Sequence, residues 1–307
     1  MTRAVVFAYH NVGVRCLSVL LAHDIEVTLV VTHPDSPTET IWFASVAELA
    51  ALHDIPVITP DDANDPAVVA RIAALSPDFL FSFYYRQMIK APLLAIPARG
   101  AFNMHGSLLP KYRGRVPVNW AVLAGEGETG ATLHRMLEKP DAGAIVAQQA
   151  VPILPDDSAF EVFQKVTVAA EMALDRVLPR LVAGSATEIV QNLAEGGYFG
   201  ARKPEDGRID WRQGAQDIHN LVRAVAPPYP GAFSTLKGKT LRVLKTMLPA
   251  RRQPRSSGPG LYAEGSALYA DCSDGRVLRL LSLEYDGMTL DAAGFLARFG
   301  TEKLLLT

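Results

Sequence analysis

The stretch Arg3-Ala-Val-Val-Phe-Ala-Tyr9 is a short apolar run, and a turn at His10–Gly13 joins it to helical spacing over Val14–Ala22. A run of this length and composition predicts a buried strand, and the spacing after the turn predicts an amphipathic helix. The same alternation continues along the chain. Further strands are predicted at residues 27–32, 56–58, 78–83, 100–105, 131–136 and 144–148, and helices at 45–53, 66–75 and 160–181. The predicted fold class is therefore α/β, with a mostly parallel sheet covered on both faces.

The first strand-to-helix turn lacks the Gly-x-Gly-x-x-Gly pattern, so the alternation does not by itself establish a dinucleotide site. Asn11 and Gly13 are placed where helix amide groups can approach an anion. Asn11 is therefore a candidate substrate contact.

The texture of the sequence changes after Gln191. Residues 195–207 have the polar, glycine-rich composition of a linker. Beyond them, a short helix at 215–224 and short strands at 231–234, 240–244, 267–270 and 277–283 favour a small barrel or sandwich. We predict a catalytic domain over residues 1–189, a linker over 190–208 and a C-terminal domain over 209–307.

Composition excludes several classes of protein. The 307 residues are 49% hydrophobic, yet no apolar run is long enough to span a bilayer, and the first residues lack the pattern of a signal peptide. We therefore expect a cytoplasmic protein without membrane insertion. Cys16 and Cys272 lie far apart and show no metal-ligand spacing, so neither a disulfide framework nor a metal site is expected.

The distribution of charge is more informative than the net charge of −2. No Lys or Arg lies between Arg15 and Arg71, whereas nine acidic residues do. Such a surface would repel a nucleic-acid backbone, so we expect no nucleic-acid partner. A solvated surface face is the simpler alternative. The nine residues are Asp24, Glu26, Asp35, Glu39, Glu48, Asp54, Asp61, Asp62 and Asp65.

The chemistry is concentrated in Asn103-Met-His105 and in Asp141, which lies in a later loop. On a strand, residues two apart point to the same side, so Asn103 and His105 can face one pocket. Asparagine can donate to a developing oxyanion, and a histidine oriented by a carboxylate can move a proton. This predicts acyl transfer in which the substrate supplies the nucleophile. The alternative is that Asn103 and Asp141 cap turns while His105 is a satisfied interior histidine.

These residues belong to a longer string that resembles the folate-dependent formyltransferase family. The family-wide part is Asn103-x-His105-x-Ser107-Leu-Leu-Pro110-x-x-Arg113-Gly114 with Asp141. The resemblance runs from Val5 to Ser234 and is weakest near the C-terminus. It implies a Rossmann-like sheet followed by a small OB-like β-barrel domain. It also implies 10-formyltetrahydrofolate as the donor.

The resemblance further implies roles for individual residues. Asn103 would stabilise the oxyanion, His105 would handle the proton, and Asp141 would raise the pKa of His105. For Arg115, one of the implied folate contacts, a solvated surface arginine is the alternative. The implied contacts are the backbone of Gln87, Met88 and Ile89, the side chain of Arg115, and the loop of Leu137, Glu138, Lys139, Pro140 and Asp141.

A second set of motifs narrows the acceptor. Phe81-Ser-Phe-Tyr-Tyr-Arg86, Thr132-Leu-His-Arg-Met136 and His219-Asn-x-Val-Arg-Ala-Val225 resemble the formyltransferase domain that acts on UDP-4-amino-4-deoxy-L-arabinose, an enzyme of lipid A modification. The resemblance implies formylation of a nucleotide-linked amino sugar. We expect a stand-alone enzyme, because the chain ends without the dehydrogenase domain of the long bifunctional relatives.

Other acceptors and classes stay open. Another 3-amino or 4-amino nucleotide sugar is the first alternative. Methionyl-tRNA is less favoured, because residues 32–45 carry only Asp35 and Glu39 as charges where tRNA-binding relatives have a basic insert. Hydrolysis of the formylfolate and a non-catalytic sensor are further alternatives. Arg202 and Lys203 are candidates for binding the diphosphate or the uridine, with solvated linker charges as the alternative.

Overall fold

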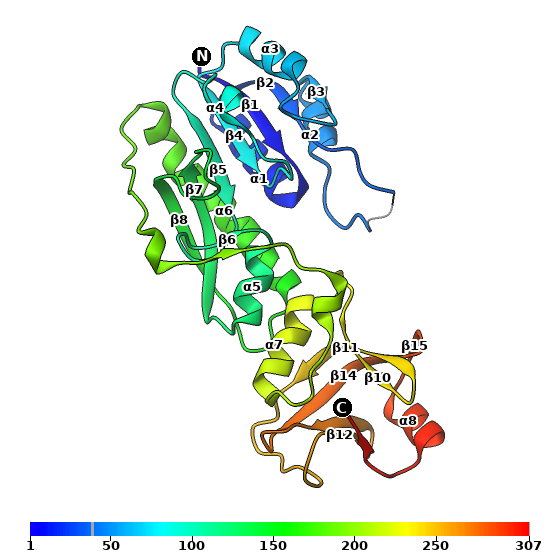
Figure 1. Cartoon of the computed structure of the whole chain (residues 1–307). Coiled ribbons are helices and arrows are strands. Elements are labelled where there is room, and N and C mark those ends of the chain that lie inside the picture. The colour runs from blue at the N-terminus through cyan, green and yellow to red at the C-terminus, as the bar shows by residue number, and fades with distance from the viewer. Residues whose placement is uncertain (38–39, 307) are drawn as a thin grey trace. The chain divides into compact units, whose positions relative to one another are not determined.

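The computed structural model describes residues 1–37 and 40–306, so the acidic residue Glu39 lies outside the described part. The chain forms two compact units, and each is described by itself (Figure 1). The first unit contains residues 1–117, 128–152 and 163–200. The second contains residues 118–127, 153–162 and 201–307. The predicted domain boundaries stay a prediction.

The first unit is built on a seven-stranded sheet in the order β3-β2-β1-β4-β5-β7-β8. β1 to β5 pair in parallel, whereas β5 pairs with β7, and β7 with β8, in antiparallel fashion. The predicted mostly parallel α/β sheet is thus confirmed, with β7 as the one described strand of this sheet that runs opposite to the others. The strands are β1 (Arg3–Ala8), β2 (Glu26–Val31), β3 (Val57–Ile58), β4 (Phe79–Phe83), β5 (Ala101–His105), β7 (Glu128–Arg135) and β8 (Ile145–Pro152).

Local chemistry explains where the helices of this unit begin. The Ser45 hydroxyl accepts a hydrogen bond from the Glu48 amide at the start of α2, and the Asp65 carboxylate accepts from the Ala67 amide at the start of α3. These caps satisfy amides that lack a partner in the first turn. The helices are α1 (His10–Ala22), α2 (Val46–Leu52), α3 (Pro66–Ala74), α4 (Ala91–Leu94) and α6 (Ala159–Val182).

The strand order places a topological switch between β1 and β4. From β1 the chain moves outward to β2 and β3, then crosses back to β4 on the other side of β1. In open α/β sheets, ligands bind beyond the carboxyl ends of the strands near such a point. β5 ends at His105, next to β4, so the predicted catalytic motif lies at this edge of the sheet.

The second unit carries a curled antiparallel sheet in the order β10-β11-β14-β13-β12-β16, with β15 paired to β14. It confirms the predicted small β domain as a half-barrel. Helix α7 (Ala215–Val225) packs on a core that includes the fully buried Trp211. Its other elements are β10 (Ala232–Leu236), β11 (Lys239–Met247), β12 (Gly260–Glu264), β13 (Ala267–Asp271), β14 (Val277–Tyr285), β15 (Met288–Thr289), β16 (Leu304–Leu305), α5 (Pro117–Leu123) and α8 (Ala292–Phe299).

The polar residues of α7 explain why residues 153–162 belong to the second unit. His219 Nε2 lies 3.0 Å from the Pro155 carbonyl oxygen, and the Arg223 guanidinium donates to the Asp157 carbonyl at 2.9 Å. The subgroup-like motif around His219 therefore holds a segment from the middle of the chain within this unit.

The remaining elements are a pair of two-residue strands and two short helical turns. β6 (Arg113–Gly114) pairs in parallel with β9 (Tyr198–Phe199), which brings the middle of the predicted linker beside the loop that follows β5. Single 3₁₀ turns lie at Leu193–Glu195 and Pro204–Gly207. Over residues 1–37 and 40–306, no helix combines the length and the apolar character needed to cross a membrane.

Candidate active site

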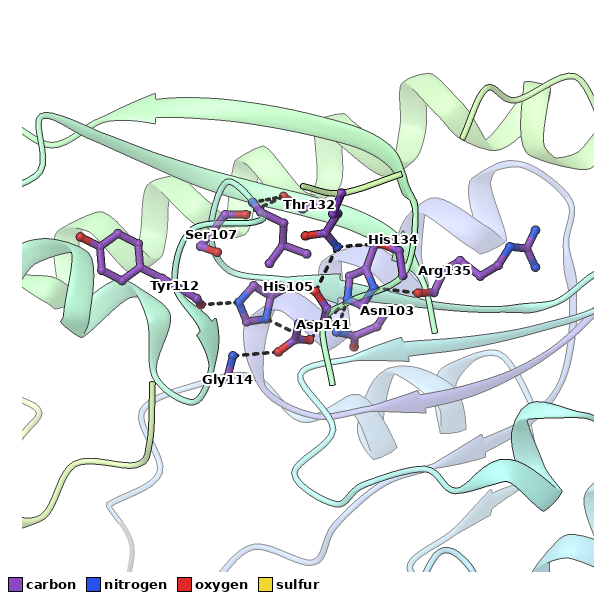
Figure 2. Close-up of polar contacts among 12 residues, drawn as sticks. Asn103, His105, Ser107, Tyr112, Gly114, Thr132, His134, Arg135 and Asp141 are labelled. Carbon is purple, nitrogen blue, oxygen red and sulfur yellow. Dashed lines mark hydrogen bonds and ion pairs between the residues drawn. The ribbon is translucent and has the colours of Figure 1, made fainter. Parts of the chain in front are cut away.

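Asn103 and His105 lie on β5, and the antiparallel partner β7 places a residue opposite each of them. Asn103 pairs with His134 and His105 pairs with Thr132. Because residues two apart on a strand share a face, these four side chains gather on one side of the sheet. Figure 2 shows Asn103, His105 and His134 grouped around the Asp141 carboxylate.

Asp141 lies between the two imidazoles. Its Oδ1 is 3.5 Å from His105 Nδ1 and 3.4 Å from His134 Nε2. Its Oδ2 accepts a hydrogen bond from the Gly114 amide at 2.8 Å. Gly114 has φ +102°, and a Cβ there would lie 2.2 Å from the Phe199 carbonyl oxygen, so only glycine fits this position. The pairing of β6 and β9 thus positions the amide that holds the carboxylate.

The tautomer of His105 follows from its hydrogen bond. Nε2 lies 2.8 Å from the carbonyl oxygen of Tyr112, and a carbonyl can only accept, so Nε2 carries a proton in both charge states. Nδ1, which faces Asp141, is therefore the nitrogen that can take up or release a proton. When Nδ1 is protonated, the imidazolium has the Tyr112 carbonyl as acceptor at Nε2 and the Asp141 carboxylate as counter-charge at Nδ1.

Burial and charge act in opposite directions on His105. Burial lowers its pKa below the ordinary value of histidine, and the neighbouring His134 adds to this lowering. Asp141 and the Tyr112 carbonyl raise the pKa of His105, but they do not compensate for burial. Asp141 thus raises the pKa of His105, as the sequence predicts, but burial makes the net pKa lower than the ordinary value. The neutral form of His105 is therefore favoured at pH 7.

The carboxylate responds in the complementary way. Burial alone would raise the pKa of Asp141, but His105, His134 and the Gly114 amide together hold its pKa well below the ordinary range of a carboxyl group. Its side chain is only 13% exposed. The site therefore contains a permanent, shielded negative charge beside a neutral base.

His134 is a site residue that the sequence did not single out. Its Nδ1 donates to the Arg135 carbonyl oxygen at 2.9 Å, so in the neutral ring Nε2 is an acceptor. That nitrogen lies 3.2 Å from Asn103 Nδ2. The contact fixes which end of the Asn103 carboxamide is the nitrogen and leaves its second N–H to donate elsewhere. The position of His134 inside the subgroup-like string 132–136 was the only signal in the sequence.

A second network orders the loop that follows β5. The buried Thr132 hydroxyl donates to the Ser107 carbonyl at 2.6 Å and accepts from the Leu109 amide at 3.1 Å and from Gln148 Nε2 at 3.0 Å. The Ser107 hydroxyl in turn donates to the Lys111 carbonyl at 2.6 Å. This loop ends at Tyr112, whose carbonyl sets the tautomer of His105 (Figure 2).

The residues expected to contact folate lie on three segments of the first unit, residues 87–89, Arg115 and residues 137–141. Gln87 donates to the Asp61 carbonyl and accepts from the Ala63 amide, so its side chain braces a neighbouring loop. Ile89 is buried in the core, whereas Met88 and Leu137 are about half exposed. Glu138, Lys139 and Arg115 are exposed, and Pro140 is partly buried. The backbone amide of Arg115 donates to the Phe199 carbonyl.

The three candidate substrate contacts are not gathered in one unit. Asn11 lies in the first unit, where its Oδ1 accepts from the Ala44 amide at 2.8 Å. Arg202 and Lys203 belong to the second unit. Arg202 lies over the Trp120 ring at 4.9 Å and donates to the Asp206 carbonyl, and burial lowers its pKa. The backbone amide of Lys203 donates a hydrogen bond to the Asp206 carboxylate.

Over residues 1–37 and 40–306, no group of three or more His, Cys, Asp and Glu side chains is arranged to hold a metal ion. Asp141, His105 and His134 form the carboxylate–imidazole cluster of the site.

Comparison with known families gives two matches. The Formyl transferase family model matches residues 13–178, more than half of the chain, and the model of the Formyl transferase C-terminal domain matches residues 202–300. Together they cover both units.

Comparison with solved structures gives the same fold. The N-formyltransferase from Helicobacter canadensis, solved with folinic acid and dTDP-3-aminofucose, is 20% identical with a TM-score of 0.72, over 91% of this chain and 99% of that one. WlaRD, a sugar 3N-formyl transferase solved with dTDP and 5-N-formyl-THF, is 19% identical with a TM-score of 0.72, over 91% and 97%. A 4-N formyltransferase from Francisella tularensis is 21% identical with a TM-score of 0.62, over 76% and 91%.

Proposed function

This chain belongs to the formyl transferase family, and we propose that it transfers a formyl group from 10-formyltetrahydrofolate to the amine of a nucleotide-linked amino sugar. The observation that carries the proposal is the position of Asp141 between His105 and His134, beside the oriented carboxamide of Asn103. This arrangement can stabilise an oxyanion and move a proton, and it leaves the nucleophile to the substrate.

The protein's own hydroxyl and thiol groups support a nucleophile that comes from the substrate. Ser107 and Thr132, the hydroxyl residues of the site, donate to backbone carbonyls. Cys16 and Cys272 are buried, and burial raises the pKa of both thiols. A thiol in this state is a poor nucleophile, because the thiolate is the reactive form.

We assign the catalytic roles as follows. The substrate amine attacks the formyl carbon, and the carbonyl oxygen that becomes negative accepts a hydrogen bond from the free N–H of Asn103. His105 Nδ1 takes the proton of the amine, and Asp141 stabilises the resulting imidazolium. A new carbon–nitrogen bond to the amine forms, the bond from the formyl carbon to N10 of the folate breaks, and the proton passes from His105 to N10.

The donor assignment rests on two observations. The two most similar neighbours described above were solved with folinic acid or 5-N-formyl-THF. In this chain, Met88 and Leu137 expose apolar surface on two of the three segments that the family resemblance assigns to the folate. An apolar slot with nearby backbone donors and acceptors suits a flat, polar-edged ring.

The acceptor assignment rests on charge and on the neighbours. The absence of Lys and Arg between Arg15 and Arg71 disfavours a tRNA acceptor, since phosphate binding depends on cations. The neighbour from Helicobacter canadensis was solved with dTDP-3-aminofucose, and the neighbour from Francisella tularensis is a 4-N formyltransferase. We select UDP-4-amino-4-deoxy-L-arabinose as the first acceptor to test, on the subgroup-like motifs, and with it a role in lipid A modification.

Arg202 is the better of the two candidate cations for the diphosphate. Its Nε is buried and makes no hydrogen bond among the described residues, so a polar group is available for a partner. Its stacking on Trp120 fixes the plane of the guanidinium. Asn11 is a weaker candidate, because its Oδ1 already accepts a hydrogen bond from the Ala44 amide. Lys203 stays a second candidate cation, and its backbone amide donates to the Asp206 carboxylate.

The test is an acceptor panel. The purified protein is incubated with 10-formyltetrahydrofolate and, in separate reactions, UDP-4-amino-4-deoxy-L-arabinose, a 3-amino and a 4-amino dTDP-hexose, methionyl-tRNA, or no acceptor, and tetrahydrofolate release is followed. We expect turnover with the 4-amino UDP-sugar. Release without any acceptor would indicate hydrolysis, and turnover with methionyl-tRNA alone would overturn the sugar assignment.

Variants link the turnover to the cluster. His105→Ala is expected to lower kcat/KM on the order of 1000-fold, since it removes the proton acceptor. His53→Ala is the matched control, because His53 is an exposed histidine at the end of α2. An unchanged rate for a folded His105→Ala protein would refute the mechanism.

A further inference from the structure

The Gln191 side chain contacts the backbone of the loop that carries Asp141. Both hydrogen bonds of its Nε2 go to backbone carbonyls: that of Asp141 at 3.0 Å and that of Gly143 at 2.6 Å. Gln191 is 50 positions from Asp141 in the sequence and belongs to no motif that we identified. It lies in the first unit, as the site does.

The path of the chain explains how Gln191 reaches this loop. Ile189 and Ile145 exchange two backbone hydrogen bonds of 2.8 Å, which form an isolated antiparallel bridge. This bridge lays residues 189–191 alongside the end of the loop that carries Asp141. Gln191 is 8% exposed, so water does not compete for its hydrogen bonds.

The loop needs such support, because Asp141 has a backbone conformation that favours glycine. Its φ is +51°, in the left-handed region. A residue held there persists when surrounding contacts fix it. The Gly114 amide holds the side chain of Asp141, and Gln191 holds its carbonyl.

The second bond of Gln191 extends the support to His134. Gly143 packs so closely that a Cβ there would lie 1.8 Å from the Arg135 carbonyl oxygen. That same oxygen accepts the Nδ1–H of His134. The Gln191 carboxamide is therefore connected through the backbone to two residues of the site, Asp141 and His134.

The free end of the carboxamide also argues for a specific role. Gln191 Oε1 is buried and has no hydrogen-bond partner among the described residues. An unsatisfied buried acceptor is destabilising, so an apolar side chain of the same size would suit this position better if only packing mattered. The two N–H donors are what such a side chain would lack.

From this geometry we infer that Gln191 is a positioning residue, which clamps the 141–143 backbone so that the Asp141 carboxylate stays between His105 and His134. The inference rests on the proposed function for its effect on turnover. It has a second consequence that needs no substrate: the electrostatic coupling between Asp141 and His105 depends on Gln191.

Two variants test this inference. Gln191→Met has a similar length and removes both donors. Gln191→Glu has the same shape and turns oxygen atoms toward two carbonyl oxygens. For each, kcat is expected to fall about 10- to 100-fold with KM for the acceptor changed less than about threefold, because a shift of about 1 Å in a catalytic group can cost about 100-fold. Gln164→Met is the matched control, since Gln164 is exposed on α6.

The substrate-independent measurement is the NMR titration of His105, assigned by comparison with His105→Ala. Asp141 and His134 are the charged or titratable groups that act on His105, and Asp141 raises its pKa. In Gln191→Met the loosened carboxylate should let the midpoint fall by about half a unit or more relative to the wild type. In Gln164→Met it should not move.

The outcomes separate this inference from the proposed function. Wild-type kcat and an unchanged His105 midpoint in folded Gln191→Met would overturn the clamp. A lowered unfolding temperature with both of those values unchanged would also overturn it, because the role would then be structural only. If Gln191→Met does not fold, Gln191→Glu carries the test. If the wild type formylates no acceptor, the proposed function fails, and the titration still decides the clamp.

Discussion

Two buried histidines, His105 in the first unit and His219 in the second, have nearly the same local chemistry and different surroundings. In both, Nε2 lies within hydrogen-bond distance of a backbone carbonyl, from Tyr112 or from Pro155. Burial lowers the pKa of both. The difference lies at the other nitrogen, where His105 faces Asp141 and His219 faces the Thr246 hydroxyl at 2.8 Å.

The comparison shows what separates His105, the histidine that we propose as catalytic, from the structural His219. His219 also has a carboxylate nearby, since Asp156 is 3.6 Å from its Nε2, but that side chain is 59% exposed. Asp141 is 13% exposed and is held by Gly114. A neutral His219 satisfies both of its hydrogen bonds, whereas His105 completes its contacts only on taking a proton. A shielded, fixed carboxylate therefore marks the reactive site, and an imidazole alone does not.

The strongest way to break this comparison is to remove the charge of Asp141. Asp141→Asn keeps the shape of the side chain and is expected to lower kcat on the order of 1000-fold, since the protonated His105 loses its counter-charge. Steady-state kinetics with 10-formyltetrahydrofolate measures the loss, and circular dichroism checks the fold. A decrease of less than about tenfold would show that the carboxylate does not define the site.

The next effect concerns His134, the second partner of Asp141. His134→Ala removes the acceptor that orients Asn103, and kcat should fall about 10- to 100-fold. His134→Gln restores an acceptor of similar reach and should recover part of the rate. Equal rates for the two variants would argue against orientation of the carboxamide as the role of His134.

The matched change in the second unit should affect stability instead. His219→Ala leaves the Pro155 carbonyl and the Thr246 hydroxyl without this partner and opens a cavity, so the free energy of unfolding should fall by about 2 to 4 kcal/mol. Urea unfolding measures this loss. The kcat of the folded variant should stay within about threefold of the wild type. A catalytic defect as large as that of His105→Ala would remove the distinction between the two histidines.

The pH dependence sharpens the same distinction. Both pKa values are lowered in the folded protein, so the unfolded chain binds protons more readily, and stability is lost as the pH falls below about 6.5. His219→Ala should weaken this loss of stability between about pH 7 and pH 5. The neutral His105 is the active base, so kcat/KM should fall on the acid side with a midpoint below about 6.5. A midpoint above that value would contradict the burial of His105.

The smallest effect is expected for the exposed carboxylate near His219. Asp156→Asn removes a solvent-screened charge and should change the free energy of unfolding by less than about 1 kcal/mol. Thermal and urea unfolding measure it beside Asp141→Asn, which is its chemical counterpart in the first unit. A loss comparable to that of His219→Ala would mean that exposure does not separate the two carboxylates.

Much of the first unit could be predicted from local pattern. The alternation of apolar runs and helical spacing predicted β1 to β5 and α1 to α3 within about four residues, because buried parallel strands need continuous apolar stretches. The four-residue helix α4 was missed. The reversed direction of β7 was not predicted, because strand direction depends on how a connection returns to the sheet. In the second unit, α5, β12, β15, α8 and β16 were missed, since each is short or lacks strong periodicity.

The candidate site, too, could be predicted from the sequence only in part. Asn103 and His105 are two apart on one strand, so the sequence by itself determined that they share a face. It also determined the family, because the surrounding string is long. Only the tertiary structure decided that His134 lies opposite Asn103, that Gln191 reaches the Asp141 loop, and that burial outweighs the carboxylate in setting the pKa of His105. Register, long-range contact and desolvation arise from packing between distant segments, and no local spacing encodes them.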